Sequence, residues 1–295
     1  MPTVYEIVTE RIIAQMEKGV VPWRKPWKTE LPCNMVSGKP YRGLNVFLLA
    51  SQGFGSRYWL TFAQCQKLGG QVMKGEKSTL VIFWKIGQEK IVKDPVTDQE
   101  RTSRPFILRY YSVFNVCQTT LAEKLGLGQP APRTDALDAA EKIAAGMPNL
   151  PKREQSDRAW YHPGTDTVGM PARALFSSGE EYYSTLFHEL THSTGHTSRL
   201  HRENFDSPHA FGSESYSKEE LVAELGASML AGIAGIETAT LNNSAAYLRH
   251  WIDRLKSDSK LLVSAASQAQ KACDYILAKQ DQEKEQEQVQ ELVNA

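Results

Sequence analysis

The segment His188-Glu-Leu-Thr-His192 constrains the fold of this 295-residue chain more than any other feature of the sequence. The apolar residues around it recur at helical spacing, and Ser178 with Glu181 forms a capping-box pattern ahead of them. On a helix, positions i and i+4 share one face, so both imidazoles can bind one tetrahedral Zn²⁺. Glu189 lies at the neighbouring edge, where a carboxylate can accept a proton from water. The segment therefore predicts a zinc-dependent, peptidase-like site.

A third metal ligand has to come from another part of the sequence. The longer metzincin motif needs a histidine six residues after His192, and this chain has Ser198 there. A later helix offers Glu220 and Glu224 on one face, an arrangement that resembles the gluzincins. We favour Glu220 as the ligand and Glu224 as the carboxylate that orients a histidine, while the reverse assignment stays open. The reserve ligands are His196, His201 and His209.

Plainer interpretations of both helices remain. The two histidines could simply occupy a polar helix face, and the two glutamates could be a solvated surface pair. The small residues at 226–228 favour close packing of the second helix on the first, which would bring the carboxylates to the histidines.

Composition indicates a soluble protein of the reducing cytoplasm. Hydrophobic residues make up 41% of the chain, an ordinary globular share, and no apolar run is long enough to span a bilayer. The four cysteines lie far apart without a CxxC pair, which argues against a disulfide framework. We expect no export and no membrane partner.

The formal net charge of zero hides an asymmetry between the two parts of the chain. Residues 1–128 contain 18 basic and 10 acidic side chains, a balance of +8, and the remainder carries −8. Within residues 18–93 the count is 13 basic against 3 acidic. Such a concentration of positive charge attracts polyanions, so nucleic acid is the expected partner of the first part.

The fold class expected from the patterns is α+β, with two domains. An α+β domain covers 1–128, a mainly helical domain with a small sheet covers 135–280, and a polar tail covers 281–295; the Gly- and Pro-rich stretch 126–134 is the linker. Helices are expected at 4–16, with Gly19 as the stop, at 45–51, 61–68 and 135–145, and three or four more up to about 277; strands are expected at 79–86, 106–116, 159–161 and 167–170.

Tryptophans alternate with basic residues in the first domain, a mixture that stacks bases and follows a phosphate backbone. Trp23 and Trp27 each follow a proline in a short charged segment, so an exposed platform is expected there. For Trp84, in an apolar run, core burial and exposure are both open. The glycine-rich stretch around Lys74 could contact phosphates, or it could be a soluble loop.

These residues resemble a known family, the ArdC-type antirestriction proteins of conjugative plasmids. The resemblance runs through residues 19–27, 37–45, 58–64 and 68–76, and in the second domain through the 188–192 segment and 220–224. It implies a domain that binds single-stranded DNA joined to a zincin-like metallopeptidase domain, which protects incoming plasmid DNA from restriction. The expected DNA-contacting residues are Trp23, Arg24, Lys25, Trp27, Lys28, Arg42, Asn45, Arg57, Trp59, Lys67, Lys74 and Lys77.

Two functional hypotheses stay open at this point. In the first, Glu189 and a zinc ion hydrolyse a protein, such as a component of the restriction machinery, while DNA binding provides location. In the second, the chain is a non-catalytic shield on single-stranded DNA, and its zincin domain is a scaffold.

Overall fold

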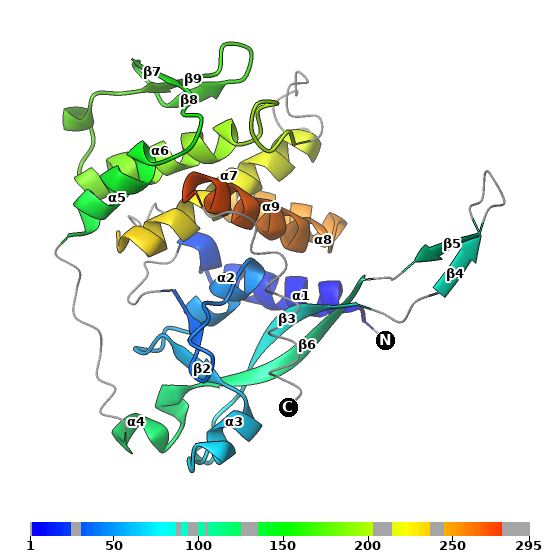
Figure 1. Ribbon diagram of the computed structural model, residues 1–295. Helices are drawn as coiled ribbons and strands as arrows, with labels where there is room; N and C mark the ends of the chain where they lie inside the picture. Colours follow the sequence, from blue (N-terminus) through cyan, green and yellow to red (C-terminus); the bar gives the residue numbers. More distant parts are fainter. Residues whose placement is uncertain are drawn as a thin grey trace.

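A computed structural model describes residues 2–24, 31–86, 90–93, 100–103, 106–124, 135–202, 214–236 and 245–278. The predicted linker 126–134, the tail 281–295, the reserve ligand His209 and the predicted contacts Lys25, Trp27 and Lys28 lie outside these residues. In Figure 1 the helices of the second part of the chain lie between two sheets, one from each part.

The first part combines short helices with a four-stranded sheet in the order β1-β2-β6-β3, in which β6 pairs antiparallel with both β2 and β3. A separate antiparallel pair, β4–β5, lies beyond the ends of β3 and β6 (Figure 1). Its elements are α1 (Val4–Met16), a 3-10 turn η1 (Pro22–Arg24), β1 (Cys33–Asn34), α2 (Leu44–Ala50), β2 (Tyr58–Leu60), α3 (Phe62–Lys67), β3 (Thr79–Ile86), β4 (Lys90–Lys93), β5 (Glu100–Ser103), β6 (Phe106–Asn115), η2 (Val116–Gln118) and α4 (Leu121–Lys124).

Local chemistry explains where the helices of this part begin and end. Thr3 caps α1 in a complete capping box with Glu6, and Thr61 caps α3 in the same way with Gln64. Gly19 follows α1 with φ of +80°, a conformation that an L side chain rarely adopts. The sequence signals for these helices are therefore also the interactions that hold their termini.

The second part places four long helices beside a three-stranded sheet of order β7-β9-β8. The strand β9 pairs parallel with β7 and antiparallel with β8. Its elements are α5 (Ala136–Ala145), β7 (Lys152–Gln155), β8 (Trp160–His162), β9 (Thr167–Met170), η3 (Arg173–Leu175), α6 (Gly179–Ser193), α7 (Glu214–Ala234), α8 (Ala245–Ser257) and α9 (Leu261–Ile276).

One hydrophobic cluster extends through both parts of the chain. It includes Ile12 of α1 and Phe47 of α2 together with Leu190 of α6 and Leu230 of α7, all fully buried. Polar contacts add to this packing, because Arg42 forms an ion pair with Asp274 of α9. The first domain is therefore packed against the helices that carry the candidate site.

The structure confirms the expected elements with strong periodicity, and adds elements that the patterns did not indicate. The expected strand at 79–86 and the helix at 4–16 match β3 and α1. The strands β1, β2, β4, β5 and β7 were not expected, because they are short and carry little alternation. In the described part of the chain, no helix has the length and apolarity needed to cross a membrane. The four cysteines are free thiols.

Candidate metal centre

The helix α6 carries the His-Glu-x-x-His segment in its last two turns. Ser178 is its N-cap and accepts a hydrogen bond from the backbone N–H of Glu181 at 3.2 Å. The expected capping box is only half present, because the Glu181 carboxylate accepts from the backbone N–H of Ser177, at 2.9 Å, and not from that of Ser178. The start of the helix thus lies where the sequence indicated, with one of its two expected bonds shifted by a residue.

Three side chains meet between α6 and α7 and offer donor atoms to one point. Nε2 of His188 lies 3.1 Å from Nε2 of His192. The carboxylate of Glu220 lies 3.6 Å from the former nitrogen, through Oε2, and 3.5 Å from the latter, through Oε1. Ligands about 2.0–2.1 Å from a tetrahedral zinc ion are separated by about 3.3 Å. The observed separations bracket that value, so the donor set fits a zinc-sized cation.

A fourth residue, Glu219, contacts the far side of His192. Its Oε1 lies 3.2 Å from Nδ1 of this imidazole, which directs the lone pair of Nε2 toward the cluster when Nδ1 carries the hydrogen. Arg202 donates to the same carboxylate through Nε, at 3.0 Å, and through a terminal nitrogen, at 2.5 Å. Arg202 also donates to the backbone carbonyls of Thr191 and His192. The pair thus braces both the imidazole and the end of its helix.

Electrostatics in this cluster favour a positive charge between the helices. Burial opposes protonation of His192, but hydrogen bonds to Glu219 and Glu220 raise its pKa to about 10. Burial alone would raise the pKa of Glu220, whereas hydrogen bonds from His188 and His192 lower it well below its usual range. Facing imidazoles and an ionised carboxylate are the combination expected of a cation site.

Glu189 lies between the two histidines in sequence and is 8% exposed. Burial raises the pKa of its carboxyl above the ordinary glutamate value, while the charges of His188 and His192 act in the opposite direction. A carboxylate with a raised pKa is a better proton acceptor near neutral pH. Glu189 therefore has the electrostatic properties of a general base.

Close packing of α7 on α6 brings the carboxylates to the histidines, as the small residues at 226–228 predicted. A Cβ added at Gly226 would lie 2.5 Å from Cγ2 of Thr191 on α6. This distance is too short for any side chain, so only glycine permits the observed approach. The solvated surface pair is therefore excluded for Glu220, which is directed into the cluster.

Glu224 is not directed toward the histidines, so the prediction that its carboxylate orients one of them is wrong. Its carboxylate accepts hydrogen bonds from Nε1 of Trp23, at 2.8 Å, and from the hydroxyl of Tyr247, and it forms an ion pair with Arg24 at 3.3 Å. One helical turn separates Glu224 from Glu220, and the rotation of α7 assigns the two carboxylates to different neighbours. The carboxylate that contacts a ligand histidine is Glu219, which the sequence reasoning missed although it directly precedes Glu220.

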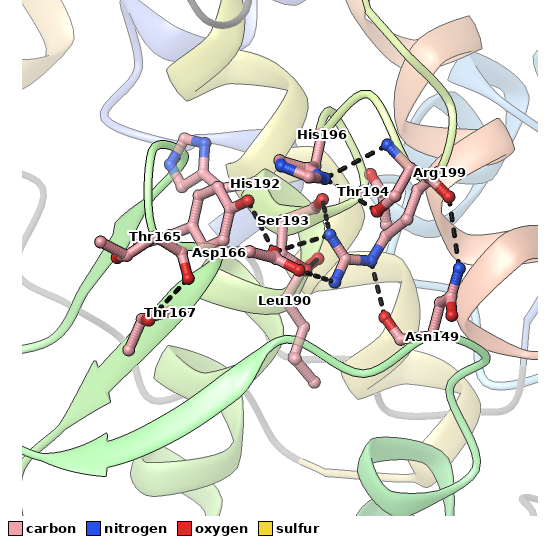
Figure 2. Close-up of polar contacts among 12 residues, drawn as sticks. Asn149, Thr165, Asp166, Thr167, Leu190, His192, Ser193, Thr194, His196 and Arg199 are labelled. Atoms are coloured by element: carbon pink, nitrogen blue, oxygen red, sulfur yellow. Dashed lines mark hydrogen bonds and ion pairs between the residues drawn. The ribbon is translucent and has the colours of Figure 1, made fainter.

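The C-terminal end of α6 is tied to the small sheet by the Arg199 cluster, defined here as Arg199, Asp166, Asn149 and Tyr161. Figure 2 shows the contacts of Arg199 with Asp166 and Asn149. The Arg199 guanidinium makes two 2.8 Å contacts with the Asp166 carboxylate and also donates to the carbonyls of Asn149, at 2.8 Å, and Ser193, at 3.1 Å. The hydroxyl of Tyr161 donates to Asp166 at 2.9 Å. This cluster holds the residue that follows His192. Its members are distant in sequence, so no local pattern indicated it.

The reserve histidines do not join the donor cluster in the described part of the chain. Nδ1 of His196 contacts Oγ of Ser198 at 2.8 Å, within the turn after α6. His201 is exposed and has φ of +46° in the same turn. The group of side chains whose donor atoms lie within 4.8 Å of one another consists of His188, His192 and Glu220.

Several residues expected to contact DNA have structural roles in the first domain. The expected exposed platform at Trp23 is wrong, because this side chain is 2% exposed and packs edge-on against Trp251. Trp59 is also 2% exposed and lies in the core against Phe54. The amide of Asn45 bonds both the N–H and the C=O of Ile82, at 2.8 and 2.7 Å, and thus acts as a strand partner for β3.

The described basic residues of the expected DNA surface fall into three groups. Arg24 and Arg42 form ion pairs with Glu224 and Asp274 of the second domain, so they join the domains. Arg57 is half-buried, with its guanidinium 5.9 Å from the ring centroid of Tyr58. The expected lysines at the end of α3 and in the stretch after it are exposed, namely Lys67, Lys74 and Lys77.

The fold and the site define a class of protein: an α+β domain packed against a zincin-like domain whose helix α6 carries His188 and His192. Family models agree with this class. Residues 2–114 match the N-terminal domain of the anti-restriction factor ArdC, and residues 138–268 match a zincin-like metallopeptidase family.

Solved structures give the particular family. The antirestriction protein ArdC of plasmid R388 is similar over 94% of this chain and 97% of its own length in a metal-free structure, with a TM-score of 0.72 and 38% identity. Its Mn(II)-bound structure is similar with a TM-score of 0.69 and 36% identity. This chain belongs to the ArdC family of antirestriction proteins.

Two curated proteins from other sources are also similar to this chain. The protein y4eC of Sinorhizobium fredii is 33% identical, with 94% of this chain and 92% of its own length covered. A DNA primase, TraC of Escherichia coli, is 36% identical over 97% of this chain, but the chain spans only 28% of the primase.

Proposed function

We propose that this protein is an antirestriction factor that binds single-stranded DNA and holds a zinc ion in a peptidase-like site, protecting incoming plasmid DNA during conjugation in the cytoplasm of the recipient cell. The observation that carries the metal site is the separation of 3.1 to 3.6 Å among the donor atoms of His188, His192 and Glu220. The DNA partner is supported by the N-terminal family match and by the +8 balance of residues 1–128. We place the domain boundary between 128 and 135, where the two matched regions separate.

The three ligands suit zinc by their chemistry as well as by their geometry. Two neutral imidazoles and one carboxylate form the ligand set of many catalytic zinc sites, which leave a fourth position open. The related R388 protein has been solved with Mn(II), which shares imidazole and carboxylate ligands with zinc. When bound, such a metal lowers the pKa of water and polarises a carbonyl oxygen.

The chain's own residues divide the remaining work. Glu189, with its pKa raised by burial, accepts the proton of water and can deliver it to a leaving amine. Glu219 and Arg202 keep Nε2 of His192 directed toward the cluster. The Arg199 cluster holds the small sheet in a fixed position against the C-terminal end of α6. The proposed reaction class is hydrolysis of a peptide bond, with a component of the restriction machinery as the substrate.

Metal analysis of four purified variants tests the site. His188→Ala and Glu220→Gln are expected to lose metal, because each removes a donor, whereas Glu189→Gln and Glu224→Gln are expected to retain about one equivalent. Full retention by folded His188→Ala contradicts the site. Loss of metal from Glu224→Gln, with normal retention in Glu220→Gln, reverses the choice of third ligand.

A cellular assay separates the peptidase from the shield hypothesis. Recipient cells that contain the intact protein or Glu189→Gln are compared by proteomics and by their restriction of incoming plasmid DNA. Protection that needs Glu189, together with a protein that is depleted only by the intact form, supports hydrolysis. Undiminished protection by a metal-loaded Glu189→Gln protein supports the non-catalytic shield on single-stranded DNA.

A further inference from the structure

The two faces of the β3–β6 ribbon have different neighbours. Register pairs Phe83 with Arg109 and Lys85 with Ile107. Because side chains alternate along a strand, these four residues share one face of the ribbon, whereas Trp84 belongs to the opposite face. We call the first of these the outer face, and it consists of Phe83, Lys85, Ile107, Arg109 and Tyr111, next to the buried pair Val81 and Val113.

The opposite face packs on the core through Ile82 and Leu108, while Trp84 and Tyr110 on the same face are 41% and 50% exposed. Ile82 and Leu108 belong to the main hydrophobic cluster, and the Trp84 ring contacts Tyr5 of α1 with 6.3 Å between centroids. Figure 1 shows α1 and α2 along this side of the ribbon. The helices of the first domain thus cover only part of this face, and they leave the distal half of the outer face, with its two cations, to solvent.

Exposure on the outer face increases away from its buried end. Val81 and Val113 are fully buried beside Trp59, and Tyr111 packs against that cluster. Further along, Phe83 is half-buried and tilts against Tyr111, with 5.4 Å between ring centroids. Lys85 and Arg109 are exposed. The result is a shallow aromatic pair bordered by two cations, held on a rigid sheet.

The charge of this face selects its partner. No acidic residue occurs from 79 to 86 or from 106 to 115, in a domain whose balance is +8. A sheet that presents aromatic rings beside Lys and Arg suits unpaired bases, which stack on the rings while phosphates contact the cations. A duplex offers no exposed base faces, and a peptide partner would not need two cations beside the rings.

We propose that the outer face of β3–β6 is a binding surface for single-stranded DNA, with Phe83 and Tyr111 stacking bases and Lys85 and Arg109 contacting phosphates. This inference rests on the proposed function, since it assigns a place to its DNA binding. It replaces the buried Trp23 and Trp59 with aromatic side chains that a base can reach.

Fluorescence anisotropy of the full-length protein with a labelled oligo(dT) of about 20 nucleotides tests the surface over a range of salt concentrations. Lys85→Gln with Arg109→Gln should lower the salt slope by about 1.4, from about 0.7 per phosphate contact, which weakens binding about 25-fold at about 0.1 M salt. Phe83→Leu should weaken DNA binding about 5- to 150-fold and leave the salt slope unchanged. Phe83→Tyr, which keeps an aromatic ring, should bind with the affinity of the unchanged protein.

Matched controls come from the same protein. Tyr110→Leu changes an exposed aromatic residue of the same strand on the opposite face, and Lys152→Gln with Arg153→Gln removes two exposed cations from β7. Both controls should bind like the unchanged protein, and circular dichroism verifies that every variant is folded.

The outcomes separate the surface from the function. Selective weakening by the outer-face variants supports the proposal. Normal binding by folded Phe83→Leu and by the double Gln variant overturns the surface while single-strand binding stands. An unchanged protein without measurable affinity for oligo(dT) overturns both, and equal losses in the β7 control reduce the effect to general charge.

Discussion

Replacing Arg199 by methionine tests how α6, the helix that carries His188 and His192, is anchored to the small sheet β7-β9-β8. The Arg199 side chain is 1% exposed, and its guanidinium donates four hydrogen bonds, two of them to the Asp166 carboxylate. Methionine keeps the approximate volume of the stem but removes every donor. The carbonyl of Asn149 then loses this donor, and the carbonyl of Ser193 keeps its hydrogen bond from the backbone N–H of His196. Among the described residues, the carboxylate keeps the hydrogen bond from the Tyr161 hydroxyl.

The expected loss of stability follows from the burial of the two partners. Removing one partner of a buried ion pair costs about 3–5 kcal/mol. The side chain of Asp166 is 30% exposed, so water can solvate part of the stranded charge. We therefore expect about 3 kcal/mol, the lower end of the range, which corresponds to about 6–12 °C in the unfolding temperature.

Urea unfolding, followed by circular dichroism, measures the difference against a matched ion pair on the surface. Lys256 and Glu17 lie 3.6 Å apart with side chains 58% and 56% exposed. Lys256→Met should therefore change the free energy of unfolding by only about 0–1 kcal/mol. A loss below about 1 kcal/mol in Arg199→Met, or one equal to that of Lys256→Met, refutes the reasoning from burial.

The effect of Arg199→Met should also depend on pH in one direction. Burial alone would raise the pKa of Asp166, but hydrogen bonds from Arg199 and Tyr161 lower it below its ordinary value. A carboxyl whose folded-state pKa lies below its unfolded value of about 3.9 stabilises the fold above that pH, and loses this effect as pH falls through the folded pKa. The difference between the two proteins should be constant near about pH 6 and shrink below about pH 4. A difference that grows on acidification contradicts this assignment.

Three further substitutions test the site and the domain contact. Gly226→Ala should cost about 1–3 kcal/mol in urea unfolding, since its Cβ would lie 2.5 Å from Thr191; an unchanged midpoint contradicts the close approach. Glu219→Gln should weaken metal affinity about 10- to 100-fold in a chelator competition while the protein stays folded, because it removes the charge that orients His192. Trp23→Ala should destabilise the protein by about 3–5 kcal/mol and leave the salt slope of DNA binding unchanged, whereas a stable variant would return Trp23 to the DNA surface.

Local signals in the sequence were sufficient to predict α6, the helix that carries His188 and His192. The i, i+4 spacing of His188 and His192 and the Ser178 cap depend on neighbours within one helical turn, so the sequence alone predicts them and the structure shows the same helix. The strand β3 was predicted with its observed bounds for the same reason, since a long apolar run between turn residues is a local pattern. The short strands β1 and β2 have no such pattern: β2 forms by pairing with β6, and β1 forms by pairing with β2.

The choice between Glu220 and Glu224 shows where local information ends. Both lie on one side of α7, and helical periodicity treats them alike. The crossing of α6 and α7, set by the contact of Gly226 with Thr191, directs the first toward the histidines. The N-terminal turn η1 takes up the second through Trp23 and Arg24, about 200 residues earlier in the chain.

The sequence by itself determined the helix that carries His188 and His192, the positive net charge of the first domain and the mixed α+β architecture. These features follow from spacing and composition along the chain. The tertiary structure alone decided which aromatic residues are reachable. Trp23, in a charged segment, and Trp59, beside Arg57, were expected to contact DNA, yet both are buried by residues far away in sequence. Burial is a property of packed elements, and no window of neighbouring residues contains it.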